Sequence, residues 1–113
     1  QLARMNTLPL RKLPWLLALG LSACSAESVK RDFDAFVADA NSCQAADECT
    51  VVFTDCPLGC FVAVRADRKN DVEAEAARLT KLYRSSGQGC AYDCVTPGEV
   101  TCTSQRCAVA PAP

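Results

Sequence analysis

Cysteine is the residue type with the most distinctive chemistry in this chain of 113 residues, which contains nine cysteines and no histidine. Cysteine at this density in a short chain is typical of a disulfide scaffold and of an oxidising compartment. The absence of histidine removes the commonest general base and the commonest metal ligand. Eight of the cysteines form an even set that can make four disulfides: Cys43, Cys49, Cys56, Cys60, Cys90, Cys94, Cys102 and Cys107.

Two pairs of these cysteines are separated by three residues, Cys56 with Cys60 and Cys90 with Cys94. Four thiolates can hold a zinc ion, but zinc ligands more often stand two residues apart. Thiol redox catalysis normally uses Cys-x-x-Cys, which this sequence lacks. We therefore expect disulfides, with no catalytic residue, no metal ion and no cofactor. A thiol redox or metal-binding protein that uses these two pairs is kept as an alternative.

The spacing of the cysteines gives only weak preferences for their pairing. Bonds from segment 56–60 to segment 90–94 would close a long loop, which stabilises a small core more than bonds within each segment would. Bonds within each segment are the competing arrangement. The other cysteines are expected to pair locally, because two of them flank a short turn: Cys43 with Cys49, and Cys102 with Cys107.

The N-terminal part has the order of an export signal. From Met5, two basic residues precede the apolar run 13–21, and two small residues follow it. A helix that crosses a bilayer needs about 20 apolar residues, and this run is much shorter, so no permanent transmembrane helix is expected. The sequence predicts a signal peptide over 5–23, and residues 1–4 are interpreted as an upstream extension.

The junction "LSAC", which ends at Cys24, resembles the lipobox of bacterial lipoproteins. The resemblance covers residues 5–24 and implies cleavage before Cys24, which would then carry acyl chains such as palmitate. Two or more acyl chains hold a protein stably on a membrane. Lipidation would also explain why the number of cysteines is odd. By the same resemblance, Ser25 in place of aspartate favours the outer membrane. An ordinary signal peptide is the alternative.

The remaining chain predicts a small disulfide-rich α+β fold. Apolar residues at helical spacing predict helices over 25–42 and 70–87. Runs rich in β-branched and aromatic residues predict strands over 49–54 and 60–65, and a second hairpin over 99–109. The expected order is α-β-β-α-β-β, with two short antiparallel hairpins packed on the two helices.

Two parts are distinguished after the signal peptide. Residues 24–42 form the lipidated N-terminus and first helix, and 43–113 form a cysteine-rich α+β domain with a loose C-terminal tail. The Cys-x5-Cys spacing that precedes a strand is loosely similar to that of small, uncharacterised, cysteine-rich exported bacterial proteins. This likeness implies no particular activity.

The sequence favours a non-enzymatic binding or structural module, anchored by lipid at Cys24 in the bacterial cell envelope. The expected place is the outer membrane, facing the periplasm or the cell surface. The net charge of −1 gives no electrostatic case for nucleic-acid binding. No protein partner can be named from the sequence.

A protease inhibitor is the second hypothesis, because the loop 56–60 ("CPLGC") lies between two cysteines at a predicted hairpin tip. Short braced loops with an exposed apolar residue fit the pockets of partners. Leu58 would be the inserting residue in a binding loop formed by Pro57, Leu58 and Gly59. A plain hairpin turn explains the same proline and glycine.

Overall fold

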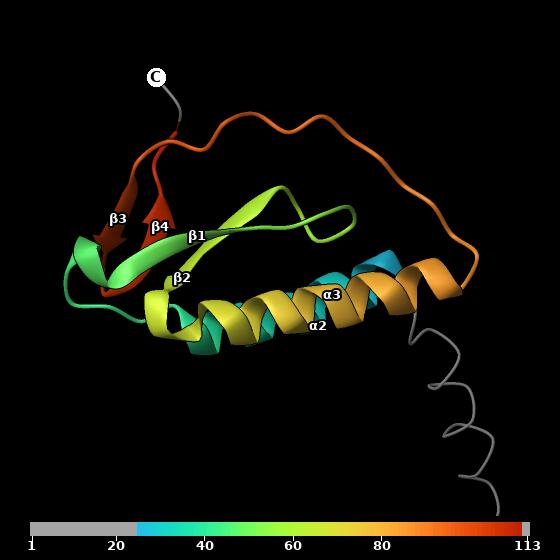
Figure 1. Cartoon of the computed structure of the whole chain (residues 1–113), viewed down its shortest axis with the longest axis horizontal. Coiled ribbons are helices and arrows are strands. Elements are labelled where there is room, and N and C mark those ends of the chain that lie inside the picture. Colours follow the sequence, from blue (N-terminus) through green and yellow to red (C-terminus); the bar gives the residue numbers. More distant parts are fainter. Residues whose placement is uncertain (1–24, 112–113) are drawn as a thin grey trace, which may run out of the picture.

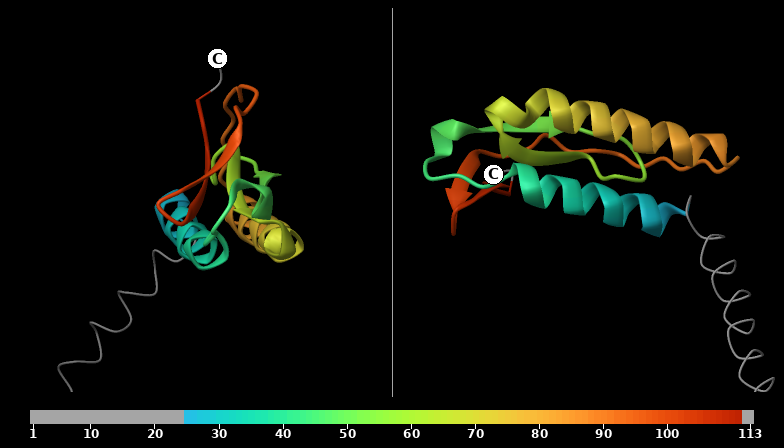
Figure 2. Two further views of the ribbon diagram at one scale, coloured as in Figure 1. Left: turned by 90° about the vertical axis from the view of Figure 1, so that its left-hand side faces the viewer. Right: turned by 90° about the horizontal axis from the view of Figure 1, so that it is seen from below.

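Two helices lie side by side beneath two β-hairpins in the computed structural model, which describes residues 25–111 (Figure 1). Helix α2 spans Ala26–Ala40 and helix α3 spans Lys69–Ser85. The two helices run in opposite directions, as two further views show (Figure 2). Within the described residues there is no helix with both the length and the apolar character that a membrane span requires.

Both helices form where the apolar periodicity predicts them. At the start of α2, the hydroxyl of Ser25 accepts a hydrogen bond of 3.1 Å from the backbone N–H of Ser28, which satisfies one of the free amides at a helix N-terminus. Past the end of α3, Gly87 has a φ of 87°, a left-handed conformation that glycine adopts without strain. The residues that the helices bury are Val29, Phe33 and Ala40 from α2, and Val72, Ala76, Leu79 and Tyr83 from α3.

Each hairpin pairs two consecutive antiparallel strands. Strand β1 (Cys49–Phe53) pairs with β2 (Phe61–Arg65), and β3 (Val100–Thr103) pairs with β4 (Arg106–Val109). The two-residue turn of the second hairpin has positive φ at both positions, 53° and 63°. Positive φ at both turn residues matches the right-handed twist of the flanking strands. The prediction of a small disulfide-rich α+β fold with two antiparallel hairpins is therefore confirmed.

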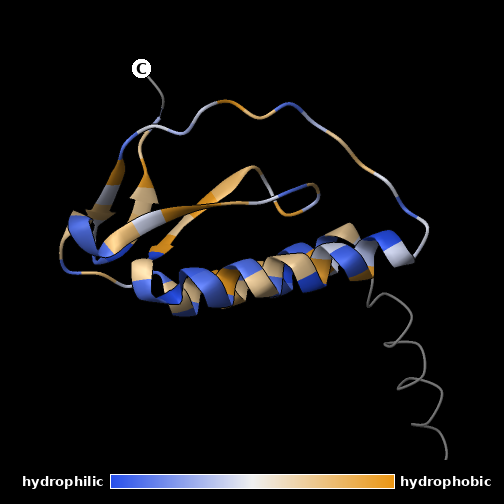
Figure 3. Cartoon of the chain, viewed as in Figure 1, coloured by the Kyte–Doolittle hydropathy of each residue, from blue (hydrophilic) through white to orange (hydrophobic). Residues whose placement is uncertain are grey.

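The first hairpin lies between the helices and the second hairpin. Its two faces alternate along each strand: Val52 and Val64 belong to the core with the helices, whereas Ala63 packs with residues of the second hairpin. Hydrophobic residues run along this hairpin, and hydrophilic residues dominate the outer sides of the helices (Figure 3). The packing thus differs from the prediction in one respect, because the second hairpin packs mainly on the first hairpin rather than on the helices.

A long segment without regular secondary structure, residues 88–99, connects α3 to β3 and passes over the first hairpin (Figure 1). We call it the strap. Residues 91–96 are all exposed, and Val95 is 73% exposed. Such a segment has few packing contacts of its own, so its course depends on the bonds that attach it to the rest of the chain.

Candidate functional site

All eight cysteines between residues 43 and 107 are bonded in four disulfides: Cys43–Cys102, Cys49–Cys107, Cys56–Cys90 and Cys60–Cys94. The expectation that segment 56–60 is bonded to segment 90–94 is confirmed, and the competing bonds within each segment are absent. Cys24, the predicted signal peptide over 5–23 and the predicted extension over 1–4 lie outside the described residues.

The predicted local bonds Cys43–Cys49 and Cys102–Cys107 are wrong. Cys102 and Cys107 do face each other across the second hairpin, but each is bonded to a residue near the start of β1. By chain entropy, a bond across the separation of 59 residues between Cys43 and Cys102 stabilises by about 4 kcal/mol, and the short loop of a local bond by about 2. The observed bonds fasten the second hairpin to the first, whereas local bonds would leave that junction without a covalent link.

Two disulfides hold the strap against the tip of the first hairpin. Cys90 and Cys94 bond to the two cysteines of the tip, each over a separation of 34 residues. Between them, the hydroxyl of Tyr92 accepts a hydrogen bond of 2.6 Å from the backbone N–H of Gly59. Within the tip, the hydroxyl of Thr54 donates to the carbonyl of Gly59 at 2.7 Å. The strap and the tip therefore form one braced unit.

Leu58 does not occupy the position that the inhibitor hypothesis requires. Only 1% of Leu58 is exposed, and it belongs to the core together with Val29 and Phe33. The N–H of Leu58 donates to the carbonyl of Asp55 at 2.8 Å within the loop, and burial of the leucine side chain contributes about 1.5–3 kcal/mol. The prediction of an exposed Leu58 is wrong, and its neighbours Pro57 and Gly59 are only partly exposed.

The sulfur atoms of the two Cys-x3-Cys pairs do not form the cluster that the metal-binding alternative needs. Within residues 25–111, the group of side chains close enough to share one ion is a different one, Cys43, Cys49 and Cys107. Their sulfur atoms all lie within 4.8 Å of one another. No spacing in the sequence indicates this group, because the packing of the hairpins brings together cysteines that are far apart in the chain.

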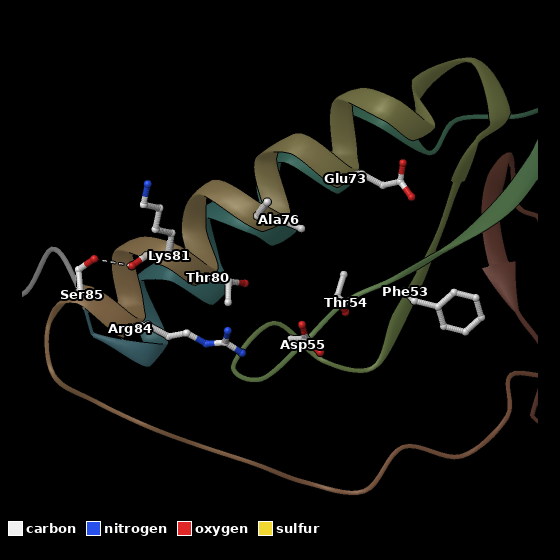
Figure 4. Close-up of a pocket in the computed structure, with 10 residues that line it drawn as sticks. Phe53, Thr54, Asp55, Glu73, Ala76, Thr80, Lys81, Arg84 and Ser85 are labelled. Carbon is white, nitrogen blue, oxygen red and sulfur yellow. Dashed lines mark hydrogen bonds between the residues drawn. The ribbon is translucent and has the colours of Figure 1, made fainter.

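A groove runs along one side of α3 and provides a candidate binding surface (Figure 4). It has a volume of about 660 Å³. On one side α3 presents Ala76, Thr80 and Arg84, and on the other lie Phe53 and Asp55, from the end of β1 and the loop after it. The side chain of Arg84 extends toward the loop that carries Asp55 (Figure 4).

The groove combines an exposed aromatic side chain with charges of both signs. Phe53 is 69% exposed and supplies apolar surface at the edge of the groove. Glu73 and Asp55 supply negative charge, and Lys81 and Arg84 supply positive charge. The arrangement suits a ligand with an apolar group flanked by polar groups. Sequence reasoning missed this surface, because its residues belong to the hydrophilic side of α3 and to a strand end.

The shifts in pKa lie outside the groove and follow from contacts at the surface. Hydrogen bonds from the guanidinium of Arg65 lower the pKa of Asp67, and those from Arg78 lower the pKa of Glu75. The closest nitrogen-to-oxygen distance is 2.7 Å in both pairs. The first pair joins the end of β2 to the short turn before α3, and the second pair lies within α3, so both are local surface contacts.

Glu48 has a lowered pKa for a different reason. Its carboxylate accepts hydrogen bonds from the backbone N–H groups of Gln44 and Ala45, at 2.6 and 3.2 Å. Both bonds favour the charged form. Glu48 thereby fixes the short segment between Cys43 and β1.

Comparison of the chain with protein-family models, with curated proteins and with solved structures finds no match.

Proposed function

We propose that this chain is a lipid-anchored, disulfide-stabilised protein of the bacterial cell envelope that acts as a non-enzymatic binding or structural module. One observation carries the proposal: the eight cysteines from Cys43 to Cys107 satisfy one another in four disulfides. Of the nine cysteines in the chain, Cys24 has no partner left for a stable intramolecular bond. Its place at the end of an export signal then makes lipidation the explanation that fits it best.

The start of the folded part is compatible with an anchor at Cys24. The N-cap of α2 is Ser25, directly after the proposed lipid attachment. A folded domain that begins one residue after its acyl chains lies close to the membrane surface. This geometry supports a module that acts at the membrane rather than one that reaches across the periplasm.

Lipidation is tested by expressing the full chain in a Gram-negative host and measuring intact mass and membrane association. The proposal predicts a mature protein that begins at an acylated Cys24, and a Cys24→Ser variant that is released from membranes or left unprocessed. Ser25→Ala is the matched control, because it changes the next residue and leaves the acylation site. A Cys24→Ser variant that is processed and membrane-bound like the wild type would refute the proposal.

The groove beside α3 supports the binding role. A photo-crosslinking amino acid at Ala77, an exposed position that lines the groove, should yield a discrete adduct in native envelopes. Ala35 is the matched control, because it is an exposed alanine on α2. Equal labelling at both positions would contradict binding through the groove and would favour a purely structural role.

Thiol titration separates the proposal from the thiol redox alternative. The exported domain is expected to contain no free thiol among its eight bonded cysteines, and non-reducing peptide mapping should return the four observed bonds. The inhibitor alternative receives no support from the buried Leu58. A screen against serine and cysteine proteases tests whether another part of the tip inhibits.

A further inference from the structure

Four cysteine sulfur atoms come together where the second hairpin meets the start of the first. They belong to the adjacent disulfides Cys43–Cys102 and Cys49–Cys107. The sulfurs of Cys43, Cys49 and Cys107 lie within 4.8 Å of one another, and that of Cys102 is bonded to Cys43. We call these four residues the cysteine cluster. Cys43 and Cys107 are buried, with 4% and 5% exposed.

Hydrogen bonds hold the backbone of the cysteine cluster independently of its disulfides. Cys102 and Cys107 are opposite residues in the β3–β4 pair. The N–H of Cys43 donates to the carbonyl of Gln105 at 3.1 Å, and the N–H of Cys107 donates to the carbonyl of Asn41 at 2.7 Å. These bonds position Cys43, Cys102 and Cys107 without the disulfides, and Cys49 is held in β1 by its pairing with Arg65 of β2.

Arg106 connects this region to α2 through a second group of hydrogen bonds. Its guanidinium donates to the carbonyl of Ala38 at 2.6 Å and to the side-chain oxygen of Asn41 at 2.8 Å. These bonds join β4 to the C-terminal end of α2. The chain segments that carry Cys43 and Cys107 are thus fixed to a helix as well as to each other.

We propose that the cysteine cluster, once reduced, binds one Zn²⁺ through four thiolates. Zinc prefers a tetrahedral set of sulfur ligands at about 2.3 Å, which places the sulfurs about 3.8 Å from one another. After reduction, the sulfurs of Cys49 and Cys107, now 2.02 Å apart, must separate by about 1.8 Å, and those of Cys43 and Cys102 by a similar distance. The sulfur of Cys43 already lies within 4.8 Å of the other two, so it must approach them by about 1 Å or less.

The chemistry has two steps. In the first, a dithiol reductant gives two electrons and two protons to each disulfide and is itself oxidised to a disulfide, which leaves four thiols on the protein. In the second, the metal displaces the four thiol protons and forms four zinc–sulfur bonds, so the complex carries a net charge of −2. Metal binding therefore releases protons and depends on pH.

The surroundings of the cysteine cluster favour such a complex. A polar hollow of about 410 Å³ adjoins Cys43 and gives an ion a path from solvent. Arg65 and Arg106 both line this hollow and place positive charge beside the negative complex. Glu48 is the acidic residue of the hollow, and its carboxylate is directed to backbone N–H groups rather than left free.

The other four cysteines provide an internal control. Cys56, Cys60, Cys90 and Cys94 form the same number of disulfides, but no three of their sulfurs are close enough to share an ion. Cys90 and Cys94 are also exposed on the strap, where reduction frees them from the hairpin tip. The proposal thus predicts metal binding by one set of four cysteines and not by the other.

The decisive experiment uses the full chain, reduced with a phosphine and titrated with Zn²⁺ against a chromophoric chelator. Tetrahedral thiolate coordination is read from the absorption of the Co²⁺ form. Wild type is expected to bind one ion. Removing one bonded pair of the cysteine cluster (Cys43→Ser with Cys102→Ser) takes away two of the four ligands and should abolish the tetrahedral Co²⁺ absorption. The matched pair Cys56→Ser with Cys90→Ser should retain wild-type affinity.

A second measurement on the wild type avoids any dependence on how the variants fold. The reduced protein is alkylated with and without Zn²⁺, and each cysteine is quantified by mass spectrometry. The metal should protect Cys43, Cys49, Cys102 and Cys107 and leave the other set reactive. Absence of binding, protection of the other set, or equal protection of all eight would overturn the proposal.

Discussion

Replacing Leu58 by alanine tests whether the tip of the first hairpin is part of the core or a presented loop. Leu58 is 1% exposed and shares a core cluster with Phe33 and Val64. Truncating a fully buried leucine removes its transfer free energy and leaves a cavity, which together cost 2.7–5.0 kcal/mol in the best-studied series, so about 3 kcal/mol is expected here. For a domain of this size that corresponds to a fall of about 15 °C in Tm.

The assay is urea and thermal unfolding with the disulfides intact, a condition in which small disulfide-bonded proteins unfold in a two-state manner. Leu82→Ala is the matched control, since Leu82 is also a leucine but is 42% exposed on α3. Its substitution should change the free energy of unfolding by less than about 0.5 kcal/mol. Equal effects of the two substitutions, or a Leu58→Ala protein as stable as wild type, would refute the assignment of Leu58 to the core.

Three further substitutions test single contacts. Gly98→Ala places a methyl group 2.7 Å from the backbone oxygen of Pro111; a loss of about 1–3 kcal/mol is expected in urea unfolding. Tyr92→Phe removes the acceptor for the N–H of Gly59, so that amide should exchange faster, with a cost of about 0.5–1.5 kcal/mol. Because the pKa of Glu48 is lowered from 4.5 in the folded chain, its stabilisation is present above that value and lost as pH falls through the folded pKa. The Tm difference between wild type and Glu48→Gln should therefore be present at neutral pH and shrink on acidification.

The helices and strands were predictable because each has a strong local signal. The apolar spacing in α2 continues over its full length and matches the buried residues Val29, Phe33 and Ala40. The helix predicted over 70–87 corresponds to α3, which ends at Ser85, shortly before Gly87 takes the left-handed conformation. Local signals of this kind depend on a few neighbouring residues, so a single sequence contains them completely.

The inward direction of Leu58 was not predictable from local signals. Proline and glycine on either side of it identify a turn, but a turn sequence does not state which side of the loop faces the core. That direction is decided by packing, because Leu58 joins the core cluster that the apolar faces of α2 and α3 form with the first hairpin. The groove beside α3 was not predicted either, because it depends on tertiary packing, namely where the end of β1 lies relative to the helix.

The pairing of the cysteines was also not predictable from local spacing, and the structure shows the physical reason. Cys102 and Cys107 face each other across the second hairpin, as the spacing predicts, and yet bond elsewhere. The second hairpin buries little large apolar surface: the buried members of its cluster are Cys43, Ala63 and Cys107. Strand pairing already closes the short loop between Cys102 and Cys107, so a disulfide there would add little stability. The junction between the two hairpins gains more from a covalent bond.

The junction between the hairpins is instead held by covalent bonds in place of a hydrophobic layer. Because two disulfides occupy the space that large apolar side chains would otherwise fill, the cysteine cluster has a structural role in the oxidised protein. The same compactness places the sulfurs at separations that a metal ion could bridge after reduction. Loss of the bonds would then weaken the junction, and metal binding would restore a cross-link between the same four positions.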